Sequence, residues 1–194
     1  MTKVLVVYGS RHGGTKGIAE RIGEVLKGRG VDATVAAAGR VNAMDVLVAD
    51  AFIVGSGVYM GSWLKEPIQF LERNQAALAA RPLWLFSSGP LLGSTIVKDD
   101  ADPNADALGP VEGPGSGGRK KIEALMAATG ARENRIFFGA FDPKDPPKTM
   151  SERFVRLMPA AKGVLPAGDF RNWDDIEAWA RAIAEALATR VAMA

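Results

Sequence analysis

Cysteine is absent from the sequence, and histidine occurs once among 194 residues, as His12. Disulfides, thiolate metal sites, iron–sulfur clusters and a cysteine nucleophile all require cysteine, so none of them is expected. A metal centre built from several histidines is excluded in the same way, and we predict no metal site. Because nothing in the composition calls for an oxidising compartment, we expect a cytoplasmic protein.

Long apolar runs are missing as well. No stretch approaches the roughly 20 apolar residues that a membrane-spanning helix needs, and the first residues show no signal-peptide pattern. Charged residues make up 24% of the chain, with a net charge of +2 and an isoelectric point near 9.0. This mild excess of positive charge favours an anionic ligand or an anionic membrane surface, and we predict no nucleic-acid partner.

The chain does contain a regular alternation of strand and helix patterns. Residues 4–8 form a continuous apolar run, as in a strand that is covered on both faces. The final helix is predicted to follow Asn172 as its cap, with Asp175 as the carboxylate of a capping box. No repeat or linker interrupts the pattern, so we expect one domain over residues 1–194. Strands are predicted at residues 4–8, 33–37, 51–54, 83–86 and 135–140, and helices near residues 18–26, 42–48, 64–71, 118–128 and 173–187.

The turn after the first predicted strand is rich in glycine and hydroxyl residues. Main-chain amides that open the following helix have no helical partner, and the helix dipole adds partial positive charge, so the turn suits a phosphate group. A Walker A loop is excluded because Lys16 follows Thr15, the reverse of the required order, and a dinucleotide-binding fingerprint lacks its third glycine. The candidate phosphate-binding residues are Ser10, Arg11, His12, Gly13, Gly14 and Thr15.

The first strand, its turn and its helix match one family pattern in a single register. The pattern is two aliphatic residues and an aromatic, then a hydroxyl residue, a small residue and a threonine, then an alanine and an aliphatic residue. Here these are Val6, Val7, Tyr8, Ser10, Gly13, Thr15, Ala19 and Ile22. The chain thus resembles the flavodoxin family, which implies an α/β fold with a five-stranded parallel sheet of order 2-1-3-4-5, helices on both faces and non-covalently bound FMN. A plain strand-to-helix turn, and a deazaflavin in place of FMN, are the alternatives that the residues leave open.

Two more loops are predicted at the same edge, because ligands of open α/β sheets bind outside the carboxyl ends of the strands. Their small residues and polar backbones suit close contact with a flat ring. Tyr59 is the candidate for stacking on the flavin ring, whereas Trp63 is expected to anchor the next helix in the core. The second of these loops has no aromatic residue, which leaves one face of the ring open to a substrate. The candidate cofactor-binding residues here are Ser56, Gly57, Val58, Tyr59, Gly61, Ser87, Ser88, Gly89, Pro90 and Leu91.

Two stretches depart from the alternation. Residues 92–118 are rich in Gly, Pro and Asp and are predicted to form an excursion from the alternating pattern. A lid over the flavin is one alternative that the sequence leaves open for this excursion. Residues 144–162 interleave basic with apolar side chains. We interpret them as a surface for substrate carboxylates or for peripheral contact with the inner face of a membrane, and a solvated helix packed on the sheet is the alternative.

Residues 55–71, 150–158 and 168–174 resemble parts of the bacterial menaquinone-dependent protoporphyrinogen oxidase family. The resemblance implies an FMN-dependent oxidoreductase of heme biosynthesis that takes hydride equivalents from a reduced tetrapyrrole and passes them to a quinone. No catalytic side chain is predicted, because the flavin carries the chemistry. The basic isoelectric point argues against an electron carrier, since carriers of the flavodoxin family are typically acidic. A soluble flavodoxin-type carrier and an NAD(P)H:quinone reductase are the alternative functions.

Overall fold

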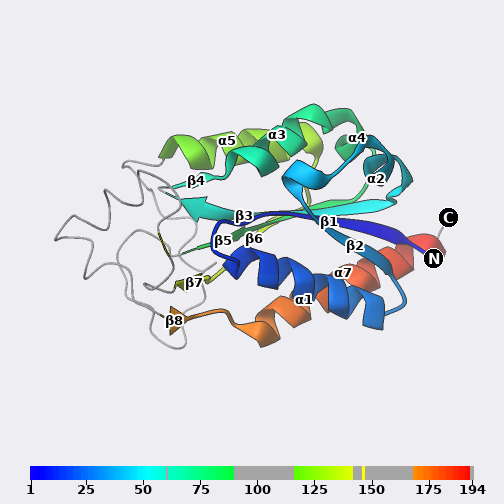
Figure 1. Ribbon diagram of the computed structural model, residues 1–194. Helices are drawn as coiled ribbons and strands as arrows, with labels where there is room; N and C mark the ends of the chain where they lie inside the picture. The colour runs from blue at the N-terminus through cyan, green and yellow to red at the C-terminus, as the bar shows by residue number, and fades with distance from the viewer. Residues whose placement is uncertain (60, 90–115, 142–145, 147–167, 193–194) are drawn as a thin grey trace.

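The computed structural model describes residues 1–59, 61–89, 116–141, 146 and 168–192. Parallel strands form its main sheet in the order β2-β1-β3-β5-β6 (Figure 1). The short strand β4 pairs with β3 and lies off this path, so the predicted order of 2-1-3-4-5 for the parallel strands is confirmed. The strands are β1 (Lys3–Gly9), β2 (Asp32–Ala37), β3 (Ala51–Tyr59), β5 (Leu83–Ser88) and β6 (Asn134–Phe137).

Helices cover both faces of this sheet, as Figure 1 shows. Val4 and Val6 of β1 enter the core on one face, and Leu5 and Val7 enter the core on the other. Alternate residues of a strand point to opposite faces, so a strand covered on both sides must be apolar throughout. One layer consists of α1 (Gly14–Gly28) and α7 (Trp173–Ala192), and the other of α2 (Ala43–Val48), α3 (Lys65–Arg73), α4 (Gln75–Ala79) and α5 (Ser116–Thr129).

Apolar side chains of α1, α7 and the sheet form a shared core. Ile18 and Leu26 of α1 are fully buried. Phe86 and Phe137 of the sheet meet Trp179 of α7 at ring-centroid distances of 6.2 and 5.5 Å. Burying a side chain of this size stabilises the fold by about 1.5–3 kcal/mol. The packing therefore holds α1 against the sheet with its N-terminus at the carboxyl end of β1.

Asparagine caps begin two of the helices. The Asn42 side chain accepts from the amide of Asp45 at 3.1 Å, and the Asp45 carboxylate accepts from the amide of Asn42 at 2.9 Å, which completes a capping box for α2. Asn172 caps α7 as predicted, since its side chain accepts from the amide of Asp175 at 3.1 Å. The carboxylate of Asp175 was expected to return to Asn172, but it accepts from Arg135 at 2.6 Å.

Strand β3 is longer than the sequence predicted. The predicted strand ended at Val54, whereas β3 continues to Tyr59 and then turns back into β4 (Ser62–Trp63), which pairs with it antiparallel. The predicted strand stops just before Gly55, but a Cβ atom at this glycine would lie 2.0 Å from the ring of Phe86, which belongs to the neighbouring strand β5. The glycine therefore makes room for a neighbouring strand's aromatic ring and does not end the strand.

The last predicted strand, at residues 135–140, divides in two. β6 ends at Phe137, and β7 (Ala140–Phe141) pairs antiparallel with β8 (Gly168–Asp169). The carbonyl of Gly139 accepts from the amide of Phe170 at 3.1 Å. After Phe137 the chain therefore leaves its parallel pairing with β5, and its next strand pairs with β8. No local sequence pattern identifies β8 as a partner.

Several predictions fall outside the described residues. They concern Pro90, Leu91, most of the excursion at residues 92–118, and the basic-apolar residues 144–162. Among the helices that the structure does describe, none is both long enough and apolar enough to cross a membrane.

Candidate functional site

The turn between β1 and α1 is built to leave main-chain amides available. Gly13 precedes the helix in a left-handed conformation (φ 87°), no side chain caps the first turn, and the turn contains no acidic residue. The first helical hydrogen bond runs from the amide of Gly17 to the carbonyl of Gly13 at 2.9 Å. The amides that precede it point out of the helix end and are available to an anion. Ser10 accepts from the amide of Gly13 at 3.1 Å and so shapes the turn.

The predicted phosphate and ring residues meet at one place. A Cβ atom on Gly57 would lie 2.9 Å from Cε2 of Tyr59 and 3.1 Å from the hydroxyl oxygen of Thr15. Thr15 is 4% exposed, and the Arg11 guanidinium lies 4.6 Å from the centroid of the Tyr59 ring. The turn after β1 and the end of β3 therefore form one continuous surface at the carboxyl edge of the sheet.

The ends of β3, β5 and β6 approach one another through main chain. A Cβ atom on Gly89 would lie 3.0 Å from the carbonyl oxygen of Val58, and one on Gly139 would lie 3.2 Å from Cα of Gly89. Ser88, which ends β5, is 3% exposed, and a Gly139 Cβ would lie 3.4 Å from its hydroxyl oxygen. Glycines at these positions keep the edge narrow and rich in peptide groups. Such an edge fits a flat, polar-rimmed ring bound through main-chain atoms.

Two of the candidate serines direct their hydroxyl groups into the protein. Ser56 donates to the carbonyl of Gly57 at 2.9 Å and accepts from the amide of Leu64 at 3.0 Å. Ser87 accepts from the indole N–H of Trp63 at 2.8 Å and donates to Asn134 at 3.1 Å. These hydroxyls hold the strand ends in place, so any contact to a cofactor here comes from main-chain atoms. Trp63 is 6% exposed and lies in the core, as expected.

The other described candidates lie on the same loops. His12 is half-buried in the turn after β1, and Val58 is half-buried near the end of β3. Gly61 occupies the turn between β3 and β4 with a φ of 76°, a conformation that favours glycine. Gly14 opens α1, beside β7. The structure therefore gathers the described candidates at one edge of the sheet.

Two further residues lie against the turn after β1, and no motif in the sequence points to them. A Cβ atom on Gly14 would lie 3.4 Å from the amide nitrogen of Ala140. The guanidinium of Arg171 donates to the carbonyl of Gly14 at 3.3 Å. Both residues reach the turn through the β7–β8 pairing, and no spacing in the sequence signals such a long-range contact.

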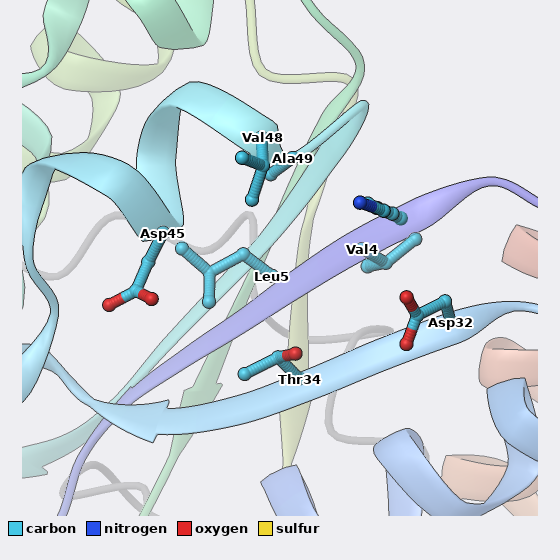
Figure 2. A pocket seen from close by; sticks show the side chains of 8 residues that line it. Val4, Leu5, Asp32, Thr34, Asp45, Val48 and Ala49 are labelled. Atoms are coloured by element: carbon cyan, nitrogen blue, oxygen red, sulfur yellow. The ribbon is translucent and has the colours of Figure 1, made fainter.

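A separate hollow lies at the opposite edge of the sheet. Lys3 begins β1 and stands in register with Asp32, which begins β2, so this hollow lies at the amino ends of the strands. Figure 2 shows Leu5 and Thr34 beneath it and Asp45 and Val48 of α2 beside it. The glycine-rich edge described above lies at the carboxyl ends of the strands, so the hollow is not part of the predicted cofactor site.

The parallel sheet and the uncapped, glycine-rich turn at its carboxyl edge define an α/β protein suited to a phosphorylated ligand. The family model of the flavodoxin domain matches residues 5–105, just over half of the chain. The chain belongs to the flavodoxin domain family, and FMN is its cofactor. The first turn of α1 has no side-chain cap and no acidic residue, which suits the phosphate of FMN, and the glycine-lined edge suits its flat ring.

Solved structures agree with this fold. A flavodoxin from the Archaea aligns with 18% identity and a TM-score of 0.52 over 95% of this chain and 97% of its own. Flavodoxin 2 from Bacillus cereus aligns with 18% identity and a TM-score of 0.57 over 95% and 99%. Rubredoxin oxygen:oxidoreductase from Desulfovibrio gigas aligns with 15% identity and a TM-score of 0.60 over 98% of this chain, which spans only 37% of that protein. No curated protein matches the sequence.

Proposed function

We propose that the protein is an FMN-dependent oxidoreductase that takes hydride equivalents from an organic substrate and passes them to a quinone. The observation that carries the proposal is the guanidinium of Arg11, 4.6 Å from the centroid of the Tyr59 ring. Tyr59 ends β3, where the flavin ring is expected. A flavin bound here would gain negative charge on taking up a hydride, and the Arg11 cation would stabilise that charge.

The other residues of the edge bind and orient. The first-turn amides and the Thr15 hydroxyl are placed to hold the FMN phosphate. Gly57 lets the Tyr59 ring lie close to the main chain and to Thr15. These groups fix the position of the cofactor, while the cofactor supplies the redox chemistry.

For the particular reaction we propose the oxidation of a reduced tetrapyrrole of the protoporphyrinogen type. The support is the resemblance of residues 55–71 and 168–174 to that oxidase family. Such an oxidation would remove one hydride equivalent and one proton from the substrate for each new double bond. FMN held at this edge would supply the two-electron redox chemistry, and a quinone that takes up two electrons and two protons would leave as the quinol. We further propose that residues 144–162 contact the membrane in which that quinone resides.

A soluble electron carrier is the second candidate. It is favoured by the flavodoxins from Archaea and Bacillus cereus, which align over 97% and 99% of their own lengths. A carrier docks through charge complementarity, and the acidic surface usual for flavodoxin carriers contrasts with the isoelectric point of about 9.0 here. The sign of the charge therefore supports the oxidoreductase.

A steady-state assay of the FMN-loaded protein separates these functions. We expect turnover of protoporphyrinogen with menadione as acceptor, and negligible reduction by NADH or NADPH. Rapid reduction by either nucleotide would identify a quinone reductase, and reduction only by a separate reductase would identify a carrier.

The role of Arg11 has its own test in the same assay. Arg11→Met is expected to slow flavin reduction about tenfold and to lower the flavin midpoint potential, because the cation beside the ring is lost. Lys27→Met removes the same charge from the last turn of α1 and serves as the matched control. Equal potentials in the two variants would contradict the role of Arg11.

A further inference from the structure

The segment between β8 and α7 grips the first turn of α1. Nη1 of Arg171 donates to the carbonyl oxygen of Gly14 at 3.3 Å. A Cβ atom on Gly17 would lie only 2.5 Å from the same nitrogen. Glycine at position 17 therefore admits the guanidinium to the side of the helix, where it reaches the carbonyl of Gly14 in the first turn.

Arg171 is held firmly in this position. Its Nε and Nη2 donate to the two carboxylate oxygens of Asp169 at 2.7 and 2.5 Å. The centroid of the Trp173 ring lies 4.4 Å from the guanidinium carbon of Arg171, and the Arg171 side chain is only 17% exposed. The hydrogen bonds from Arg171 hold the pKa of the Asp169 carboxyl below its ordinary value, so this carboxylate is ionised at neutral pH.

The same segment is tied to the sheet edge. β8 pairs with β7, and the amide of Phe170 donates to the carbonyl of Gly139 at 3.1 Å. A Cβ atom on Gly14 would lie 3.4 Å from the amide nitrogen of Ala140 in β7. The first turn of α1 is therefore supported by β7 and by the segment between β8 and α7 together.

We propose that Asp169 and Arg171 form a latch that holds the first turn of α1 in its phosphate-binding geometry. The proposal rests on FMN binding at this turn. Gly13, Gly14 and Gly17 give the turn unusual backbone freedom, and ordering them for a ligand costs conformational entropy. A charged side chain fixed by a bidentate ion pair reduces that cost before the ligand arrives. Arg171 is thus a positioning residue for the cofactor phosphate.

The test compares FMN with riboflavin, which has the same ring but no phosphate. Flavin fluorescence titrations give the Kd of each ligand for the wild-type chain and for Arg171→Met. We expect the Kd for FMN to rise about three- to tenfold, while the Kd for riboflavin changes less than about twofold. Only the phosphate end of the site depends on the latch, so the selectivity for FMN falls.

Arg21→Met is the matched control. Arg21 lies further along α1 and also joins this helix to α7, through an ion pair of 2.5 Å with Glu177. Losing it costs stability at the contact between α1 and α7 without touching the first turn, so both flavin affinities should stay within about twofold of wild type. Arg171→Lys keeps the charge but not the bidentate fork, and an intermediate FMN affinity is expected. This milder change also gives a reading if Arg171→Met does not fold.

Each outcome separates the latch from the cofactor assignment. A wild-type preference for FMN that both Arg171 variants retain would overturn the latch alone. Equal wild-type affinities for FMN and riboflavin would overturn the phosphate site, and the latch with it. A proportional loss of both affinities in Arg171→Met would show a general structural role and would also overturn the proposal.

Discussion

At the scale of single residues, Thr15 has the clearest consequence. It is 4% exposed in the first turn of α1, and its hydroxyl faces the space beside Gly57. Thr15→Ala should raise the Kd for FMN about tenfold or more, because a hydrogen bond to a charged phosphate contributes roughly 1.5–3 kcal/mol. Fluorescence titration measures the change, and Thr15→Ser should retain most of the affinity. An unaltered Kd in the alanine variant would remove Thr15 from the phosphate site.

Gly57 sets the position of Tyr59. In Gly57→Ala the new Cβ would meet the Tyr59 ring at 2.9 Å and the Thr15 hydroxyl at 3.1 Å, so the ring must move away. We expect a shifted visible flavin spectrum and weaker FMN binding. Gly28→Ala is the control, because nothing lies within 4 Å of the added carbon. If the two variants give identical spectra, Tyr59 does not adjoin the flavin.

The sequence placed the candidate residues in the first turn but did not show what each side chain contacts. The register of strand, turn and helix depends on neighbours in the chain, which is why Ser10 and Thr15 could be assigned to this turn. Ser56 and Ser87 looked equally suitable, yet their hydroxyl groups bond to Leu64, Trp63 and Asn134 inside the protein. Which hydroxyl faces inward depends on packing between strands, and the local sequence does not contain that information.

At the scale of elements, α1 and α7 are joined by ion pairs as well as by apolar contact. Glu177 accepts from Arg21 at 2.5 Å and from Arg181 at 3.2 Å. The hydrogen bond from Arg21 is the main cause of a lowered pKa for the Glu177 carboxyl. A lowered pKa in the folded state means that the pair stabilises the fold at neutral pH and loses this effect as the pH falls below about 4.3, the ordinary value for Glu.

The expected result is a pH-dependent difference between wild type and Glu177→Gln. Wild type should have the higher Tm at pH 7, and the difference should shrink towards pH 3 as Glu177 takes up its proton. Thermal unfolding followed by circular dichroism at both pH values measures it. A difference that is constant over this range would show that the charge of Glu177 contributes nothing.

The sequence predicted the parallel strands well because each is covered on both faces and must be apolar throughout. It failed where one element depends on a distant one. Gly55 lies inside β3 because the Phe86 ring needs its space, and β7 forms because β8 returns to pair with it. The Arg171 contact to Gly14 depends on that return and was missed with it.

At the scale of the whole molecule, the cofactor contributes to folding stability. We expect FMN to bind the folded chain at the carboxyl edge of the sheet, which exists only when β1, β3, β5 and β6 are assembled. A ligand present at 100 times its Kd stabilises the folded state by about 2.7 kcal/mol. For a chain of this size each kcal/mol raises Tm by roughly 2–4 °C, so saturating FMN should raise it by about 5–10 °C.

Riboflavin and inorganic phosphate divide this effect between the two ends of the cofactor. At the same concentration as FMN, riboflavin should raise Tm less, because it leaves the amides at the start of α1 without their anion. Inorganic phosphate at tens of millimolar should reduce the shift caused by FMN and leave that caused by riboflavin unchanged. Scanning calorimetry with each ligand measures the shifts. Equal shifts for FMN and riboflavin, insensitive to phosphate, would show that the turn after β1 holds no phosphate, and the flavin would then require another place on the sheet.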